Sequence, residues 1–183
     1  MNSSVTEQIL QQVQGSVDAN KGYFYLWKSH VLFVWQWWLQ LALTIVPIAL
    51  WIVLRKRDST ARLLYVGFFV MLVTSWMDFV GSSFGLWYYP IKLIPTIPPF
   101  FPWETCITVT ILLLLQYKPA FSPWLKAFGF GLADTFVGEP MAKWMGLYIP
   151  LHWRYIYSLP IYIAIYLTAH YLARSNSFEK LGR

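Results

Sequence analysis

Charged side chains are scarce in this sequence. Only 12% of its 183 residues are Asp, Glu, Lys or Arg, about half the roughly 25% that is usual in soluble domains. Hydrophobic residues make up 57% of the chain, and the mean hydropathy is +0.47. So little charge excludes an ordinary soluble domain. Apolar runs near the ~20 residues needed to cross a bilayer recur along the chain, which indicates a polytopic membrane protein.

Cysteine and the familiar catalytic motifs are also missing. The single Cys106 excludes an internal disulfide and any CxxC motif. There is no P-loop, no GxSxG and no HExxH, and the three histidines are too scattered to form a metal site. We therefore expect neither a metal nor a cofactor. The net charge of +6 does not predict nucleic-acid binding, because the basic residues form no face and lie at the ends of apolar runs.

The sequence predicts an all-α fold, a polytopic bundle of five transmembrane helices over residues 31–172. The five spans are expected at about 31–54, 63–80, 103–116, 124–148 and 155–172. The fourth is expected to be broken near Pro140.

Residues 1–30 differ from the rest and predict an amphipathic interfacial segment. A helix with one apolar edge, too polar to insert, is expected to lie on the membrane surface or on the rest of the protein and to be broken at 18–22. The apolar edge repeats every four residues: Val5, Ile9, Val13 and Val17.

The basic residues predict the orientation. Five spans place the first and third loops and the C-terminus on one side, with nine of the 14 basic residues. These nine are Arg55, Lys56, Arg57, Arg62, Lys118, Lys126, Arg174, Lys180 and Arg183. By the positive-inside rule we expect a multi-pass cell-membrane protein with its N-terminus outside and residues 173–183 as a polar cytoplasmic tail.

Acidic residues are few, and half of them fall where acids are costly. Four of the eight lie in or at the edge of apolar spans: Asp78, Glu104, Asp134 and Glu139. A charge at the bilayer centre costs roughly 2.5–3.5 kcal/mol even on a lenient scale, so such groups need partners, water or a proton. The predicted topology gathers all four on the outer side. Each also has a structural interpretation: Glu104 suits a helix N-terminus, and Asp134 suits a buried polar contact.

An outward-facing aromatic and carboxylate pocket is the resulting site prediction. Arg154 is expected there as a counter-ion or as a headgroup anchor. The ten predicted ligand-binding residues are Asp78, Trp87, Tyr88, Trp103, Glu104, Asp134, Glu139, His152, Trp153 and Arg154. The tryptophans also suit an interfacial aromatic belt.

Four segments carry a family resemblance: Asp78, the run Gly85-Leu86-Trp87-Tyr88-Tyr89, Pro102-Trp103-Glu104 and His152-Trp153-Arg154-Tyr155. With these segments the chain resembles a family of small multi-pass membrane proteins of spore-forming Gram-positive bacteria. That family has no assigned activity, so the resemblance implies a topology and no mechanism.

A shorter stretch is similar to the membrane-embedded lycopene cyclase domain. There a Gly-x-Trp-x-Tyr segment precedes a Pro-x-Glu-Glu motif that opens the next helix. Gly85, Trp87, Tyr89, Pro102 and Glu104 match this pattern over about 20 residues, and the second Glu of the motif is Thr105 here. The likeness implies chemistry on an isoprenoid.

Three functions remain open at this point. The first is a non-catalytic membrane protein that binds a small or lipid-like ligand, or a membrane-protein partner, in the outward pocket. The second is an enzyme acting on an isoprenoid or lipid, with Glu104 or Asp78 as general acid. The third is a proton-coupled transporter. The inner halves of the spans weaken it, because only His170 could continue a proton relay there.

Overall fold

The computed structural model describes residues 3–95 and 102–175, and the described chain is mostly helical. The predicted tail beyond Ser175 and the middle of the proline-rich loop lie outside these residues. The elements, in chain order, are α1 (Ser3–Leu26), η1 (Trp27–Val31), α2 (Trp35–Leu54), η2 (Arg57–Ser59), α3 (Thr60–Ser83), β1 (Trp87–Tyr88), α4 (Pro102–Gln116), α5 (Pro123–Ala133), η3 (Asp134–Gly138), α6 (Glu139–Trp144), β2 (Ile149–Pro150), η4 (Tyr155–Tyr157) and α7 (Ser158–Arg174).

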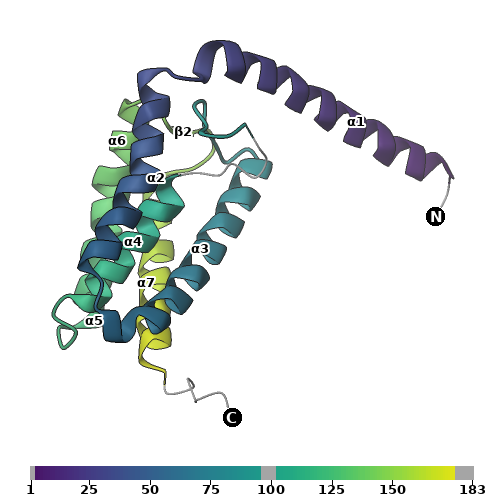
Figure 1. Ribbon diagram of the computed structural model, residues 1–183. Coiled ribbons are helices and arrows are strands. Elements are labelled where there is room, and N and C mark those ends of the chain that lie inside the picture. Colours follow the sequence, from purple (N-terminus) through teal and green to yellow (C-terminus); the bar gives the residue numbers. More distant parts are fainter. Residues whose placement is uncertain (1–2, 96–101, 176–183) are drawn as a thin grey trace, which may run out of the picture.

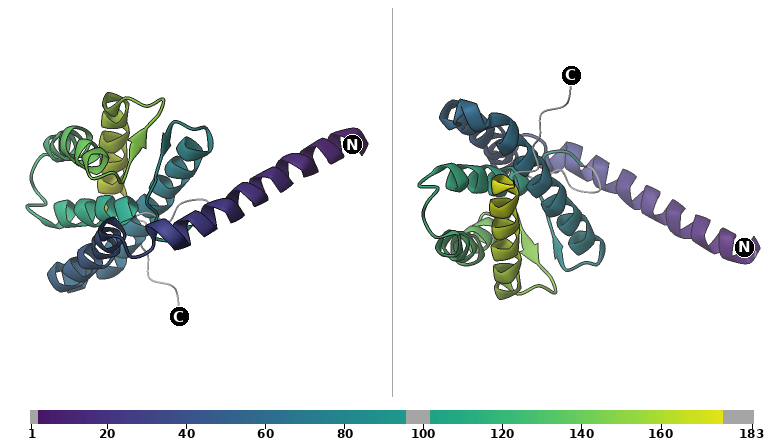
Figure 2. Two further views of the ribbon diagram at one scale, coloured as in Figure 1. Left: turned by 90° about the horizontal axis from the view of Figure 1, so that it is seen from above. Right: turned by 90° about the horizontal axis from the view of Figure 1, so that it is seen from below.

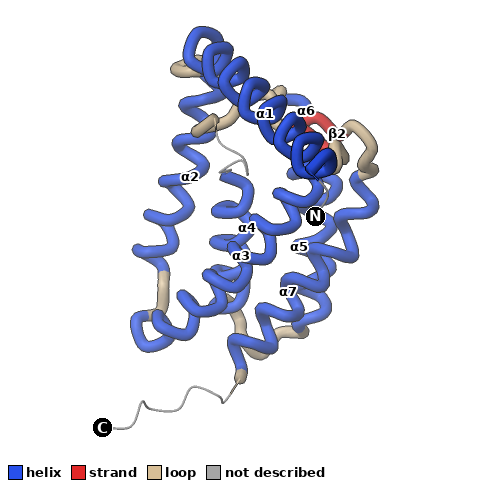
Figure 3. The backbone as a smooth tube through the Cα atoms, turned by 90° about the vertical axis from the view of Figure 1, so that its right-hand side faces the viewer, coloured by secondary structure: helices blue, strands red, loops and turns tan. Residues whose placement is uncertain are grey.

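Helices α2 to α7 form a bundle with two distinct ends (Figure 1). Helix α4 packs against α2 and α3, while α7 packs against α5 and α3. The end that carries α6 and the paired strands β1 and β2 is called the ribbon end here. The opposite end, called the tail end, carries the α2–α3 and α4–α5 connections and the C-terminal end of α7 (Figures 1 and 3).

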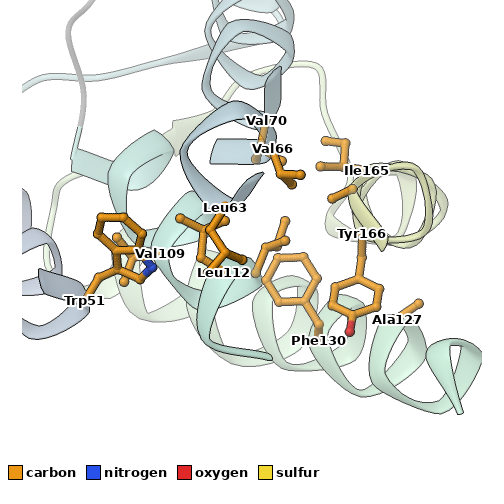
Figure 4. Close-up of a cluster of buried hydrophobic side chains, with 12 residues drawn as sticks. Trp51, Leu63, Val66, Val70, Val109, Leu112, Ala127, Phe130, Ile165 and Tyr166 are labelled. Atoms are coloured by element: carbon orange, nitrogen blue, oxygen red, sulfur yellow. The ribbon is translucent and has the colours of Figure 1, made fainter. Parts of the chain in front are cut away.

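The bundle core lies where α3, α4, α5 and α7 meet (Figure 4). Val66 and Val70 from α3, Ile111 from α4 and Tyr166 from α7 are fully buried. A Cβ added to Gly131 on α5 would lie 3.1 Å from Leu159 Cδ1 on α7. The absence of a side chain at Gly131 therefore lets the two helices approach closely.

Among the described residues, three helical segments are long and apolar enough to cross a membrane. They are Trp35–Leu54, Arg57–Ser83 and Tyr155–Arg174. Helix α4 is also apolar but has only 15 residues. Helix α2 leaves much of its apolar surface exposed, including Val46 and Val53, which are 58% and 79% exposed. A surface of this kind suits contact with lipid.

The fourth predicted span is not a single α-helix. A π-helical turn, Asp134–Gly138, separates α5 from α6, and Pro140 follows in the first turn of α6. Proline has no backbone N–H to donate, so the regular hydrogen-bond ladder fails where the sequence places the break. The turn begins at Asp134 and ends two residues before Pro140.

The N-terminal helix corrects one expectation. The predicted break at 18–22 is absent, because α1 continues to Leu26 and a π-helical turn follows to Val31. Asp18 accepts hydrogen bonds from Gln14 Nε2 at 3.1 Å and from Lys21 Nζ at 3.4 Å. Such i, i+4 and i, i+3 contacts stabilise a helix locally. Helix α1 leaves the ribbon end as an extended rod, also seen in Figure 2.

Candidate functional site

A tight turn after α3 begins the site. Gly85 has φ +66°, a value that glycine adopts without strain, and Leu86 N donates to Gly81 O at 2.9 Å. The chain reverses there and lays the Trp87 indole against α3. A Cβ on Gly81 would lie 2.0 Å from two carbons of that indole, so only glycine permits the contact.

A two-stranded antiparallel ribbon fixes the chain on both sides of this turn. Trp87 pairs with Pro150 and Tyr88 with Ile149. Leu86 O also accepts from the backbone N–H groups of Leu151 and His152. The ribbon thereby joins the segment after α3 to the segment after α6.

Aromatic rings meet beside the ribbon. The Trp87 and Trp153 rings lie 5.0 Å apart edge to face, and the Tyr89 and Tyr148 rings lie 5.8 Å apart. Trp153 Nε1 donates to Ser158 Oγ at 2.9 Å at the start of α7. These contacts make a continuous aromatic wall at the ribbon end.

Side chains from α1, η1 and α2 hold the start of the proline-rich loop. Gln40 is fully buried, and its Nε2 donates to Ile91 O at 2.6 Å. The other donors to this loop are Tyr23 OH to Pro90 O at 3.4 Å, Trp27 Nε1 to Lys92 O at 2.8 Å and Trp37 Nε1 to Leu93 O at 3.1 Å. Burial raises the pKa of Tyr23 to about 12, with a further contribution from Tyr88. Hydrogen bonds from side-chain N–H and O–H groups to backbone carbonyls thus anchor the start of this loop.

A cavity of about 120 Å³ lies behind the aromatic wall, bounded by α3, α4, η3, α6 and α7. Its walls are mostly apolar and aromatic. The aromatic residues that line it are Trp87, Tyr89, Trp103, Tyr148, Trp153 and Tyr162. The acidic residues that line it are Asp78, Glu104, Asp134 and Glu139. The described lining residues include no Lys, Arg or His.

Asp78 is held by one of its two carboxylate oxygens. Oδ1 accepts from Trp87 Nε1 at 2.8 Å and from Tyr89 OH at 2.5 Å. Burial raises the pKa of Tyr89 well above its usual value, and the nearby Asp78 raises it further, so the phenol remains a donor. Asp78 Oδ2 is buried and has no hydrogen-bonding partner among the described residues.

Two more acidic residues of the cavity, Asp134 and Glu139, come from η3 and α6. Glu139 Oε1 accepts from Tyr162 OH at 3.0 Å. Glu139 Oε2 and Asp134 Oδ2 are buried and lack a partner within the described chain. Glu104, from the first turn of α4, is only 6% exposed. Among the described residues, no Lys or Arg forms an ion pair with Asp78, Asp134 or Glu139.

Lys92 is a basic residue near the site, although it does not line the cavity. Burial lowers its pKa, and the negative charge of Asp78 opposes that shift. Its Nζ lies over the Tyr23 ring, 4.8 Å from the centroid. The cation is therefore held by an aromatic ring outside the cavity.

The structure brings seven of the ten predicted ligand-binding residues to the cavity: Asp78, Trp87, Trp103, Glu104, Asp134, Glu139 and Trp153. It places Tyr88, His152 and Arg154 outside. Tyr88 alternates with its neighbours along β1 and is 42% exposed. His152 is exposed, and its Nδ1 lies 3.1 Å from Gly85 O. Arg154 was expected as a counter-ion for the acids or as a headgroup anchor; it is exposed before η4 and does not line the cavity, a position that suits the anchor.

Sequence reasoning missed the tyrosines of the site. Tyr89 and Tyr148 lie in segments without helical periodicity, and only the ribbon pairing brings them together. Tyr162 had a signal, since it belongs to a polar stripe with Ser158 that repeats every four residues on the last helix.

A metal ion does not suit this arrangement. Among the described residues, no three His, Cys, Asp or Glu side chains are grouped closely enough to hold one. The carboxylates instead lie around the walls of an apolar chamber. The chain matches no protein-family model, no curated protein and no solved structure.

Proposed function

We propose that this chain is a multi-pass membrane protein of five spans that binds a small or lipid-like ligand in the cavity at its ribbon end. The single observation that carries the proposal is a chamber with aromatic walls and buried carboxylate oxygens left without partners. Apolar concave sites with a few placed polar groups are typical of ligand binding. An unsatisfied buried polar atom costs about 1–3 kcal/mol, so a ligand that satisfies it binds favourably.

The five-span topology rests on three long apolar segments together with two shorter helical runs. These shorter runs are α4 and the interrupted stretch 123–144. Basic residues concentrate in the connections at the tail end, including Arg55, Lys56 and Arg57. By the positive-inside rule that end faces the cytoplasm, and the cavity at the ribbon end then lies in the outer half of the bilayer.

Enzymatic use of the same cavity is the second candidate. Asp78 favours it, because Trp87 and Tyr89 fix one carboxylate oxygen, while the other is buried without a partner among the described residues. A carboxyl held in this way can exchange a proton with a bound substrate. Conversion of a bound lipid by the wild type, lost in Asp78→Asn, would distinguish an enzyme from a binder.

The test of ligand binding uses a variant that fills the cavity. Ala142 is 2% exposed and lines the chamber, so Ala142→Leu places an isobutyl group inside it. Ala61→Leu is the matched control, because Ala61 is exposed on α3. Protein extracted into native-lipid particles is analysed by native mass spectrometry after mild delipidation.

We expect a bound species in the wild type and in Ala61→Leu that is depleted in Ala142→Leu. Thermal unfolding of all three proteins confirms that each is folded. Identical spectra for folded wild type and folded Ala142→Leu would contradict the proposal.

A further inference from the structure

The charge pattern of the cavity points to the chemical class of its ligand. Four acidic residues line the chamber, and its described lining contains no basic residue. We infer that the ligand carries an organic ammonium group, which binds between the carboxylates and against the aromatic wall. This inference rests on the proposed function, since it names the ligand of the same cavity.

Three carboxylate oxygens carry the argument. Asp78 Oδ2, Asp134 Oδ2 and Glu139 Oε2 are all buried, and none has a hydrogen-bonding partner among the described residues. Their residues belong to α3, η3 and α6, and all three residues line the chamber, so its acids come from different elements. An anionic or neutral apolar ligand would leave these acceptors unsatisfied. A cation with N–H or polarised C–H groups would complement them.

The aromatic wall favours the same class. Indole and phenol rings attract cations through the negative faces of their π-systems, and tryptophan does so most strongly. Trp87 and Trp153 meet edge to face at 5.0 Å, and Trp103 lines the same chamber. Three indoles therefore line one chamber together with carboxylates, the residue types that bind alkylammonium groups in aromatic cages.

Size and spacing separate an organic cation from a metal ion. The described acids are not grouped closely enough for three of them to share one ion. An alkylammonium group is larger than a metal ion and does not need three ligands at coordination distance. The volume of about 120 Å³ is slightly below the roughly 150 Å³ of an engineered cavity that holds benzene. A headgroup of similar size, such as trimethylammonium, is therefore the appropriate probe.

The experiment compares choline with 3,3-dimethylbutan-1-ol, which has the same shape and no charge. Binding to the purified full chain in nanodiscs of uncharged lipid is measured by calorimetry and by thermal shift. We expect choline to bind at least tenfold more tightly than the alcohol. Asp134→Asn and Glu139→Gln should each weaken choline binding by about tenfold, a loss typical of one charge-assisted contact. Asp58→Asn is the control, because Asp58 is exposed in η2 outside the cavity.

A second arm identifies the source of the ammonium group. Nanodiscs that contain a diacyl lipid with a trimethylammonium headgroup are compared with nanodiscs that contain the neutral diacylglycerol. Retention of only the ammonium lipid indicates a lipid ligand, whereas binding of only choline indicates a soluble amine. Either result, or both together, supports the inference.

Other outcomes overturn the inference and separate it from the proposed function. Equal affinity for choline and its neutral isostere refutes the ammonium class but leaves a ligand cavity in place. If neither charged probe binds while Ala142→Leu still depletes a bound species, the inference again fails alone. If neither probe binds and Ala142→Leu changes nothing, both proposals fail. The comparison of choline with the neutral alcohol uses only the wild-type protein. It therefore remains informative even if a substitution prevents folding.

Discussion

Gly81→Ala is the substitution that tests the architecture of the site most sharply. The new Cβ would lie 2.0 Å from Cη2 and Cζ2 of the Trp87 indole, inside any permitted contact. The indole must therefore move, and it then loses its 2.8 Å hydrogen bond to Asp78 Oδ1. The substitution does not destabilise helix α3 itself, because alanine has a higher helix propensity than glycine.

The magnitude follows from two terms. Overpacking of a close contact costs about 1–3 kcal/mol, and loss of a hydrogen bond to a charged group costs about 1.5–3 kcal/mol. We expect a total of roughly 2.5–6 kcal/mol, which lowers the melting temperature by roughly 5–24 °C at about 2–4 °C per kcal/mol. Thermal unfolding in one detergent measures this loss. Gly129→Ala is the matched control, because a Cβ there meets nothing within 4 Å.

A double-mutant cycle identifies the cause of the loss. If the clash with the indole is responsible, Gly81→Ala should be nearly neutral once Trp87→Ala has removed the ring. A melting temperature for Gly81→Ala equal to that of Gly129→Ala would refute the reasoning. So would a large loss that persists in the Trp87→Ala background, since the clash would then involve another group.

Three further predictions test topology, charge and the loop anchor. With Cys106 replaced by serine, a cysteine at Lys92 should react with a membrane-impermeant thiol reagent in intact cells and one at Asp58 should not; the reverse pattern would overturn the orientation. Asp134→Asn should leave the melting temperature unchanged or raise it, because it removes a charge from an apolar site where Oδ2 has no described partner; a marked fall would indicate a structural role. Gln40→Leu should lower stability by about 1–3 kcal/mol and speed hydrogen exchange in the proline-rich loop, because its 2.6 Å bond to the loop backbone is lost; unchanged exchange would contradict the anchor.

Helix positions were predictable from the sequence, because apolar runs of the right length form helices in membranes with few alternatives. The runs expected at 31–54, 63–80, 103–116 and 155–172 correspond to α2, α3, α4 and α7 within a few residues. The polar stripe on the last helix also faces inward, since Ser158, Tyr166 and His170 are buried.

The non-helical parts of the site were less predictable. Two-residue strands carry no periodicity, so the pairing of Trp87 with Pro150 had no local signal. Arg154 looked like a counter-ion because it is close to a span end in sequence. The ribbon instead directs the chain so that Trp153 turns inward and Arg154 outward. The four acids could be predicted together, because a charge in an apolar span is costly and such a residue needs a partner, water or a proton. This cost can be recognised from the sequence without knowing the conformation of the loops.

The N-terminal helix shows how local side-chain contacts can outweigh breaking residues. Asp18 and Gly22 were interpreted as an interruption, yet α1 passes through them. The hydrogen bonds to Asp18 from one turn on either side favour the helix there. Val5, Ile9 and Val13 are exposed along α1, so the helix has an apolar edge that can contact a membrane surface, as the sequence predicts.

The most direct test of the central claim is the electron density inside the cavity. The measurement is a structure of the chain purified in native lipid, without added ligand, at a resolution that separates a bound molecule from ordered water. We predict continuous density in contact with Asp78 Oδ2, Asp134 Oδ2 and Glu139 Oε2 and flanked by Trp87 and Trp153. A cavity occupied only by water, or closed by side chains that satisfy those three oxygens, would contradict the account.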